Sequence, residues 1–152
     1  MRKTVHRFAR LVPFVAIVAA LMVPTVALAA DTSIQPQSAT LVAKGAEVDV
    51  TVSFTCPMGL TVGTPGFMPG IGAAVFLQQA VSKTEQAAGS GFSNGQTCTG
   101  QPQTALVPVL ANVPGPPFRK GLGVASAFLL ACDANYNCVQ ATSAPVTIRI
   151  SR

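Results

Sequence analysis

Apolar and polar residues alternate most regularly over residues 47–56. The even positions are apolar and the odd positions are polar, with Val48 and Phe54 in the first group and Asp49 and Ser53 in the second. Successive side chains of a β-strand point to opposite faces, so a period of two predicts a strand with one buried and one solvated face. We expect the apolar face of this strand to contribute to the core, with Cys56 on the same side.

Several other segments have the composition of short strands. Over 122–132 larger residues at the even positions form one face and small residues, mainly Gly and Ala, form the other. Pro108 lacks a backbone N–H donor and indicates an edge position or a bulge in its strand. A turn is expected at Lys44-Gly45, and a long loop over the Gly- and Pro-rich residues 57–72. The further expected strands are 38–42, 73–81, 103–110, 122–132 and a last strand in two parts, 139–143 and 146–150.

About seven short strands without a convincing amphipathic helix predict an all-β fold. The number of strands and the turns between them favour an immunoglobulin-like β-sandwich, with a small barrel as the alternative. Residues 31–152 are enough for one such domain with a single core.

Residues 1–30 have the pattern of a cleavable signal peptide. Basic residues precede an apolar stretch, which ends in the small-x-small motif Ala27-Leu28-Ala29. We expect cleavage after Ala29 or Ala30 and a protein that is secreted or associated with the cell envelope. The alternative is a retained anchor, since residues 11–30 can just supply the roughly 20 apolar residues of a spanning helix. Contact with a membrane is expected only through this segment.

The net charge of +5 belongs largely to that leader. From residue 31 onward six Lys and Arg residues face five Asp and Glu residues, which leaves +1. Beyond the leader, the one basic cluster in sequence is the Arg119-Lys120 pair, which can contact an anionic envelope polymer but is more typical of a solvated surface. A nucleic-acid partner is therefore disfavoured.

Four cysteines lie beyond the leader, and an even number in a small exported chain predicts two disulfides. Three pairings are possible in principle. Asp and Asn residues between Cys132 and Cys138 favour a turn that brings these two together, which leaves Cys56 for Cys98. A metal site is the alternative, but no CxxC motif and no His accompany the thiols.

Catalytic chemistry is poorly represented in residues 31–152. They contain no His, which excludes Ser-His-Asp and Cys-His triads and His-based zinc sites. Glu47 and Asp49 are the close carboxylate pair, and we place them on the solvated face of a strand. An enzyme would need Glu85, Asp133 or another carboxyl in a cleft with a raised pKa. We expect a non-enzymatic protein without a metal or cofactor.

Two groups of residues are candidates for contact with a partner. Leu60, Phe67, Met68 and Phe92 can border an apolar cleft for a small ligand. Tyr136 lies at the tip of the predicted Cys132–Cys138 turn, a rigid position from which an aromatic ring can reach a partner. The partner itself is unknown; an envelope component, a protein and a small apolar ligand are all compatible with these residues.

Framework features spread over most of residues 31–152 form a recognisable set. They are Ser38-Ala39-Thr40-Leu41, Gly45, Phe54-Thr55-Cys56-Pro57, Cys98 and the closing Val146-Thr147-Ile148-Arg149-Ile150. This set resembles small secreted Ig-like domains of actinobacteria that form a family of unknown function, and it implies fold and export alone. The short loop between Cys132 and Cys138 is similar to one in neocarzinostatin-type apoproteins, which are secreted two-disulfide sandwiches. That likeness implies a carrier of an apolar ligand.

Overall fold

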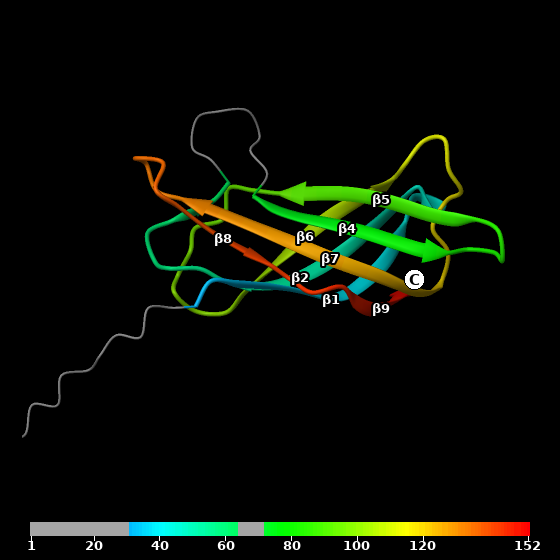
Figure 1. Cartoon of the computed structure of the whole chain (residues 1–152), viewed down its shortest axis with the longest axis horizontal. Helices are drawn as coiled ribbons and strands as arrows, with labels where there is room; N and C mark the ends of the chain where they lie inside the picture. Colours follow the sequence, from blue (N-terminus) through cyan, green and yellow to red (C-terminus); the bar gives the residue numbers. More distant parts are fainter. Residues whose placement is uncertain (1–30, 64–71) are drawn as a thin grey trace, which may run out of the picture.

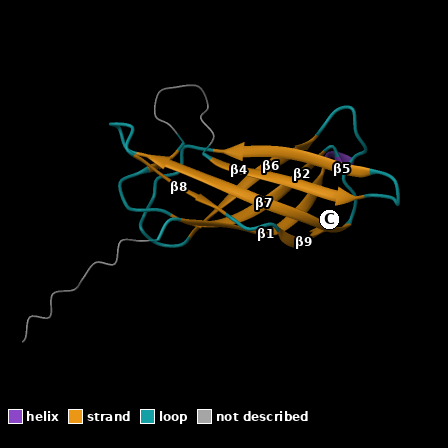
Figure 2. Ribbon diagram, in the orientation of Figure 1, coloured by secondary structure: helices purple, strands orange, loops and turns teal. Residues whose placement is uncertain are grey.

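The computed structural model describes residues 31–63 and 72–152, and its regular structure is almost entirely β-strand (Figures 1 and 2). A short 3-10 turn, Ala43–Gly45, joins the first two strands. No helix in these two ranges is long and apolar enough to cross a membrane. The strands are β1 (Ser33–Val42), β2 (Glu47–Thr55), β3 (Thr61–Val62), β4 (Ala73–Ala80), β5 (Gln86–Ser93), β6 (Gln103–Ala111), β7 (Gly121–Cys132), β8 (Cys138–Thr142) and β9 (Val146–Ser151).

Seven of these strands close into a barrel-like ring in the order β7-β4-β5-β6-β2-β1-β9, with β9 pairing back onto β7. The short strands β3 and β8 pair with β7. Two junctions of the ring are narrow, because β5 and β6 share two residue pairs and the parallel strands β1 and β9 share two. In Figure 1, β5, β4, β7 and β8 lie in front of β6, β2 and β1. The all-β prediction is confirmed, and the closed ring agrees with the barrel alternative; the immunoglobulin-like topology stays a prediction.

The strand predicted over residues 47–56 is β2, and its alternation has the expected meaning. Val48, Val50 and Val52 are completely buried, while the residues between them are half-buried. Phe54 and Cys56 continue the buried row. Since β2 pairs with both β1 and β6, its apolar side chains lie in the middle of the core.

The orientation of β7 is not the one that side-chain size alone favours. Its small residues, including Ala125 and Ala127, face the core, whereas Leu122 is 62% exposed and Val124 is also exposed. The opposite wall of the interior carries the Val residues and Phe54 of β2, so small residues on β7 fit the space that remains. Leu129 is the large residue of β7 that is buried.

Strand β5 lies in a region to which the sequence pattern assigns no strand. Gly89 and Gly91 weaken its strand character, yet both are required by the approach of β6. A Cβ atom added to Gly91 would collide with the carbonyl of Pro108, and one added to Gly89 would collide with that of Leu110. The β5–β6 ladder stops at the pair Ser90–Leu110, two residues from Pro108. Pro108 thus acts as a local ladder end, although β6 as a whole is not an edge strand.

Other boundaries also differ from expectation. Strand β1 begins at Ser33, well before residue 38, and bulges between Pro36 and Ser38 where it pairs with β2. Residues 57–72, predicted as a loop, contain the two-residue strand β3. The predicted signal peptide, residues 1–30, lies outside the described residues.

Both predicted disulfides are present. Cys56 and Cys98 are joined across a Cα–Cα distance of 5.4 Å, and Cys132 and Cys138 across 4.0 Å. All four cysteines of the sequence lie in the described ranges, and each is bonded. The first bond ties the end of β2 to the segment between β5 and β6, and the second closes the turn between β7 and β8.

Candidate binding surface

Large apolar side chains of β4, β5 and β7 point outward from the front layer. Phe76, Phe92, Leu122 and Val124 are exposed, and Phe128 is half-buried. Ala74 on β4 is paired with Phe92 of β5 on one side and with Phe128 of β7 on the other. Phe76, two residues along β4, projects on the same face as Ala74 and is paired with Ser126. Phe76 is 55% exposed and Phe92 is 50% exposed. We call the face formed by Ala74, Phe76, Phe92, Ser126, Phe128 and Thr142 the aromatic face.

A shallow groove of about 400 Å³ runs along this face, between β4 and β7. Phe76 and Phe128 lie among its lining residues, together with Ala74, Ser126, Ala127 and Thr142 at the β8 side. All six are uncharged, and Ser126 and Thr142 supply the hydroxyl groups. The groove is therefore suited to an apolar surface that brings few polar groups with it.

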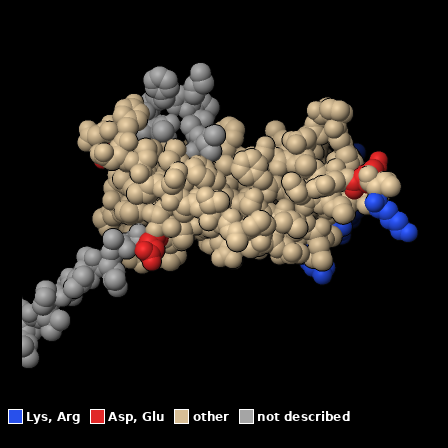
Figure 3. Space-filling view, viewed as in Figure 1, with Lys and Arg blue, Asp and Glu red and all other residues tan. Residues whose placement is uncertain are grey.

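Charged side chains are absent from the middle of the front layer in Figure 3. Acidic atoms lie toward both ends of the molecule in that view, whereas Lys and Arg atoms are seen at the right-hand end. The outward residue that follows Phe76 on β4 is Gln78, and its neighbour on β7 is Val124. The aromatic face is thus continued by uncharged residues along β4 and β7.

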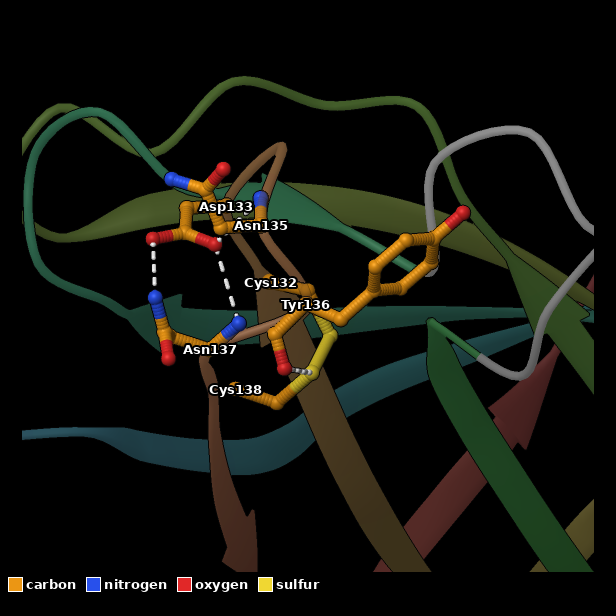
Figure 4. The surroundings of a disulfide bond; sticks show 6 residues. All are labelled: Cys132, Asp133, Asn135, Tyr136, Asn137 and Cys138. Carbon is orange, nitrogen blue, oxygen red and sulfur yellow. Dashed lines mark hydrogen bonds between the residues drawn. A yellow bond between two sulfur atoms is a disulfide. The ribbon is translucent and has the colours of Figure 1, made fainter.

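The turn between β7 and β8 is rigidified by Asp133 as well as by the disulfide (Figure 4). The Asp133 carboxylate accepts hydrogen bonds from the backbone N–H of Asn135 at 2.8 Å, the backbone N–H of Asn137 at 2.9 Å and the side-chain amide of Asn137 at 2.8 Å. These bonds, led by that from the Asn137 side chain, hold the pKa of Asp133 below its ordinary value of 3.8.

Tyr136 lies in this turn in the left-handed region, with φ of 62°, and its side chain is exposed. In Figure 4 its ring points away from the disulfide and from the Asp133–Asn137 bonds. A left-handed conformation is uncommon for a residue other than Gly, Asn or Asp, so the closed turn constrains the backbone at Tyr136. Tyr136 is therefore presented on a fixed support, as the sequence indicates.

The apolar cleft expected from Leu60, Phe67, Met68 and Phe92 is only partly represented. Phe92 belongs to the aromatic face, but Leu60 is half-buried and packs against the core. Phe67 and Met68 lie outside the described residues. Phe76 and Phe128 were not among the predicted contact residues. The signal for Phe128 is the apolar run 128–130, and that for Phe76 is the apolar run 73–77, because neighbouring residues of a strand face opposite sides and part of each run must point outward.

The acidic candidates of the sequence analysis include Glu47 and Asp49 on β2 and Asp133 in the turn between β7 and β8. No group of three or more His, Cys, Asp and Glu side chains in the described ranges is placed to hold a metal ion. Glu47 and Asp49 are on the outward face of β2, away from the buried Val residues. A catalytic Asp133 would need a raised pKa, whereas its pKa is lowered by the hydrogen bonds of the turn. The comparisons with protein-family models, curated proteins and solved structures find no match to this chain.

Proposed function

We propose that this protein is an exported, non-enzymatic Ig-like module that binds an apolar surface of another protein through the aromatic face. The observation that carries the proposal is the orientation of β7. Phe128 points outward on the strand next to Phe76, and Val124 and Leu122 follow on the same outward face of β7, while small residues and Leu129 occupy the core side. Contiguous exposed apolar surface on a small protein is typical of an interaction site.

Export is supported by the disulfides and the leader pattern. Disulfides persist in oxidising compartments, and a small domain gains much of its stability from them. The Ig-like assignment is supported by the two layers and by the narrow junctions between β5 and β6 and between β1 and β9, which leave the ring close to two facing sheets.

Edman sequencing of the secreted chain should begin at Ala30 or Asp31; recovery of an intact leader on the cell surface would refute cleavage.

A protein partner fits the aromatic face better than a small ligand does. Binding sites for small molecules typically enclose 70–90% of the ligand surface. Here the groove is lined by one face of one layer. Tyr136, at the end of β7, adds an aromatic contact on a rigid turn, and aromatic residues are enriched in protein interfaces.

Site-specific photocrosslinking in the producing cells tests this proposal. A benzophenone amino acid replaces Phe76 or Phe128, and the matched controls carry it at Leu106 or Leu110, which are exposed apolar residues of β6 in the other layer. We expect both front positions to give an adduct with the same protein and both controls to lack it. Adducts of equal yield from both layers, or none from the front, would overturn the proposal.

The second candidate is a carrier of a small apolar ligand, which the groove between Phe76 and Phe128 favours. Native mass spectrometry of the secreted protein distinguishes the two. A retained small molecule that is lost from Phe76→Ser/Phe128→Ser but kept by Leu106→Ser/Leu110→Ser would support the carrier. A bare protein mass and no binding of an apolar dye would exclude it. Hydrolase activity in the purified domain would contradict both candidates.

A further inference from the structure

A second cavity, lined by cations, lies at the end of the ring where β1 and β9 end and β7 begins. It has a volume of about 550 Å³, is open to solvent and is formed by residues from three separate parts of the chain. Leu41 and the buried Phe118 provide apolar lining. Lys44, Arg119, Lys120 and Arg152 surround it. We call this the basic cavity.

The charges around the basic cavity are unbalanced. It holds four of the six Lys and Arg side chains in residues 31–152, and none of the five Asp and Glu side chains lines it. Within the described part of the chain, none of the four cationic side chains has a hydrogen bond or an ion pair. Like charges around one cavity repel one another, so an anion that enters the cavity removes an unfavourable interaction as well as forming new ones.

The backbone that carries these cations is fixed by interior contacts. Gln79 of β4 is only 4% exposed, and its side-chain amide donates to the carbonyl of Arg119 at 2.7 Å while its side-chain oxygen accepts from the N–H of Arg119 at 2.8 Å. The N–H of Phe118 donates to the carbonyl of Gly45 at 2.9 Å, which joins this segment to the turn that holds Lys44. Three of the four cations are thus placed on two segments that are bonded to each other and to the ring.

We propose that the basic cavity binds a phosphate-bearing anion. A phosphate monoester carries between about −1.5 and −2 charges near neutral pH and offers several acceptor oxygens, which suits a site with four cations better than a single carboxylate does. The two Arg side chains can each form paired hydrogen bonds with phosphate oxygens, and the two Lys side chains supply compact charges. This site is separate from the aromatic face, and it does not depend on the function proposed there.

Binding of inorganic polyphosphate to the secreted, disulfide-bonded protein tests the proposal, with titration calorimetry as the readout. The variant Arg119→Gln/Lys120→Gln removes two charges from the cavity. The control Lys83→Gln/Arg149→Gln removes the same net charge from residues that do not line it. We expect the first variant to bind about tenfold or more weakly, and the control to bind within about twofold of the wild type.

Ionic strength and a second probe complete the test. Raising the salt from about 0.1 M to about 1 M shortens the Debye length from about 10 Å to about 3 Å and should weaken binding. Vesicles that contain phosphatidic acid, whose headgroup is a phosphate monoester, are compared with vesicles of phosphatidylcholine alone. Binding to the phosphatidic acid vesicles but not to polyphosphate, lost in the cavity variant alone, assigns a lipid headgroup as the source of the phosphate. Equal losses in variant and control, or no binding to either probe at about 0.1 M salt, would overturn the proposal. Circular dichroism of both variants verifies that the fold is kept.

Discussion

Replacement of Gln79 by Met is expected to destabilise the protein through one local contact. Gln79 is the buried polar side chain of β4, and both of its side-chain hydrogen bonds go to the backbone of Arg119. Met has a similar length and fills the same space, so the substitution removes the two bonds without leaving a large cavity. The N–H and carbonyl of Arg119 then lose their partners at the end of the ring.

The size of the effect follows from these two bonds. A hydrogen bond contributes about 1 kcal/mol net, and a buried polar group left unpaired costs about 1–3 kcal/mol. The Arg119 side chain is exposed and the two bonds are only partly buried, so water can satisfy part of what is lost. We therefore expect Gln79→Met to lower the free energy of unfolding by about 2 kcal/mol, which is a large share of the roughly 5–15 kcal/mol typical of a domain.

Urea denaturation with the disulfides intact measures this change. With a slope of about 1–3 kcal/mol/M, a loss of about 2 kcal/mol moves the midpoint down by about 1 M. The matched control is Gln78→Met, which alters the neighbouring outward-facing residue and should change stability by less than about 0.5 kcal/mol. If both variants unfold at the midpoint of the wild type, the Gln79–Arg119 contact does not stabilise the fold and the reasoning is wrong.

Three further predictions concern the turn, the disulfides and β5. Because the pKa of Asp133 is lowered, its carboxylate stabilises the folded state above the ordinary pKa, and this stabilisation is lost as the pH falls through the lower folded value. Asn137→Ala should raise the pKa of Asp133 toward 3.8 in an NMR titration, and an unchanged pKa would contradict the assignment. Loss of the Cys56–Cys98 bond, which spans 42 residues, should lower the free energy of unfolding by about 4 kcal/mol. Loss of the Cys132–Cys138 bond, which spans 6 residues, should lower it by about 2 kcal/mol. If denaturation shows the same loss of stability for both, loop entropy is not the cause. Gly91→Ala should lower the free energy of unfolding by about 1–3 kcal/mol, because the added Cβ meets the Pro108 carbonyl. The neighbouring substitution Ser90→Ala should lower it by less than about 0.5 kcal/mol. Equal denaturation midpoints for the two variants would refute the close approach of β5 to β6 at Gly91.

The local sequence pattern was sufficient to predict buried residues where one face of a strand is solvated and the other is buried. Strand β2 is of this kind, and its buried residues were predicted individually from the alternation. The disulfide pairing followed from the same kind of short-range information, because Asp and Asn residues between Cys132 and Cys138 favour a turn. Neither inference needed contacts between distant segments.

Prediction from the local sequence pattern failed where a residue type is required by contact with a neighbouring strand. Gly89 and Gly91 indicate a loop in the sequence, yet in the structure they allow β5 to approach β6. The aromatic face required knowledge of which side of β7 is buried. The basic cavity was beyond reach for the same reason, because Lys44, Arg119 and Arg152 are far apart in sequence and only the closed ring brings them together.

The core and the aromatic face are consequences of one arrangement on β7. The interior is filled from the side of β2 by three Val residues and Phe54, and from β4 by Val75 and Leu77. A protein interior packs to a nearly fixed density, so β7 can direct only small residues, together with Leu129, into that space. Its remaining large apolar residues must then face outward, although exposure of so much apolar surface is unfavourable in water. Cross-strand pairs such as Ala74–Phe128 stabilise a sheet by only about 0.2–1 kcal/mol each, and this is why we propose contact with a partner as the role of the outward residues.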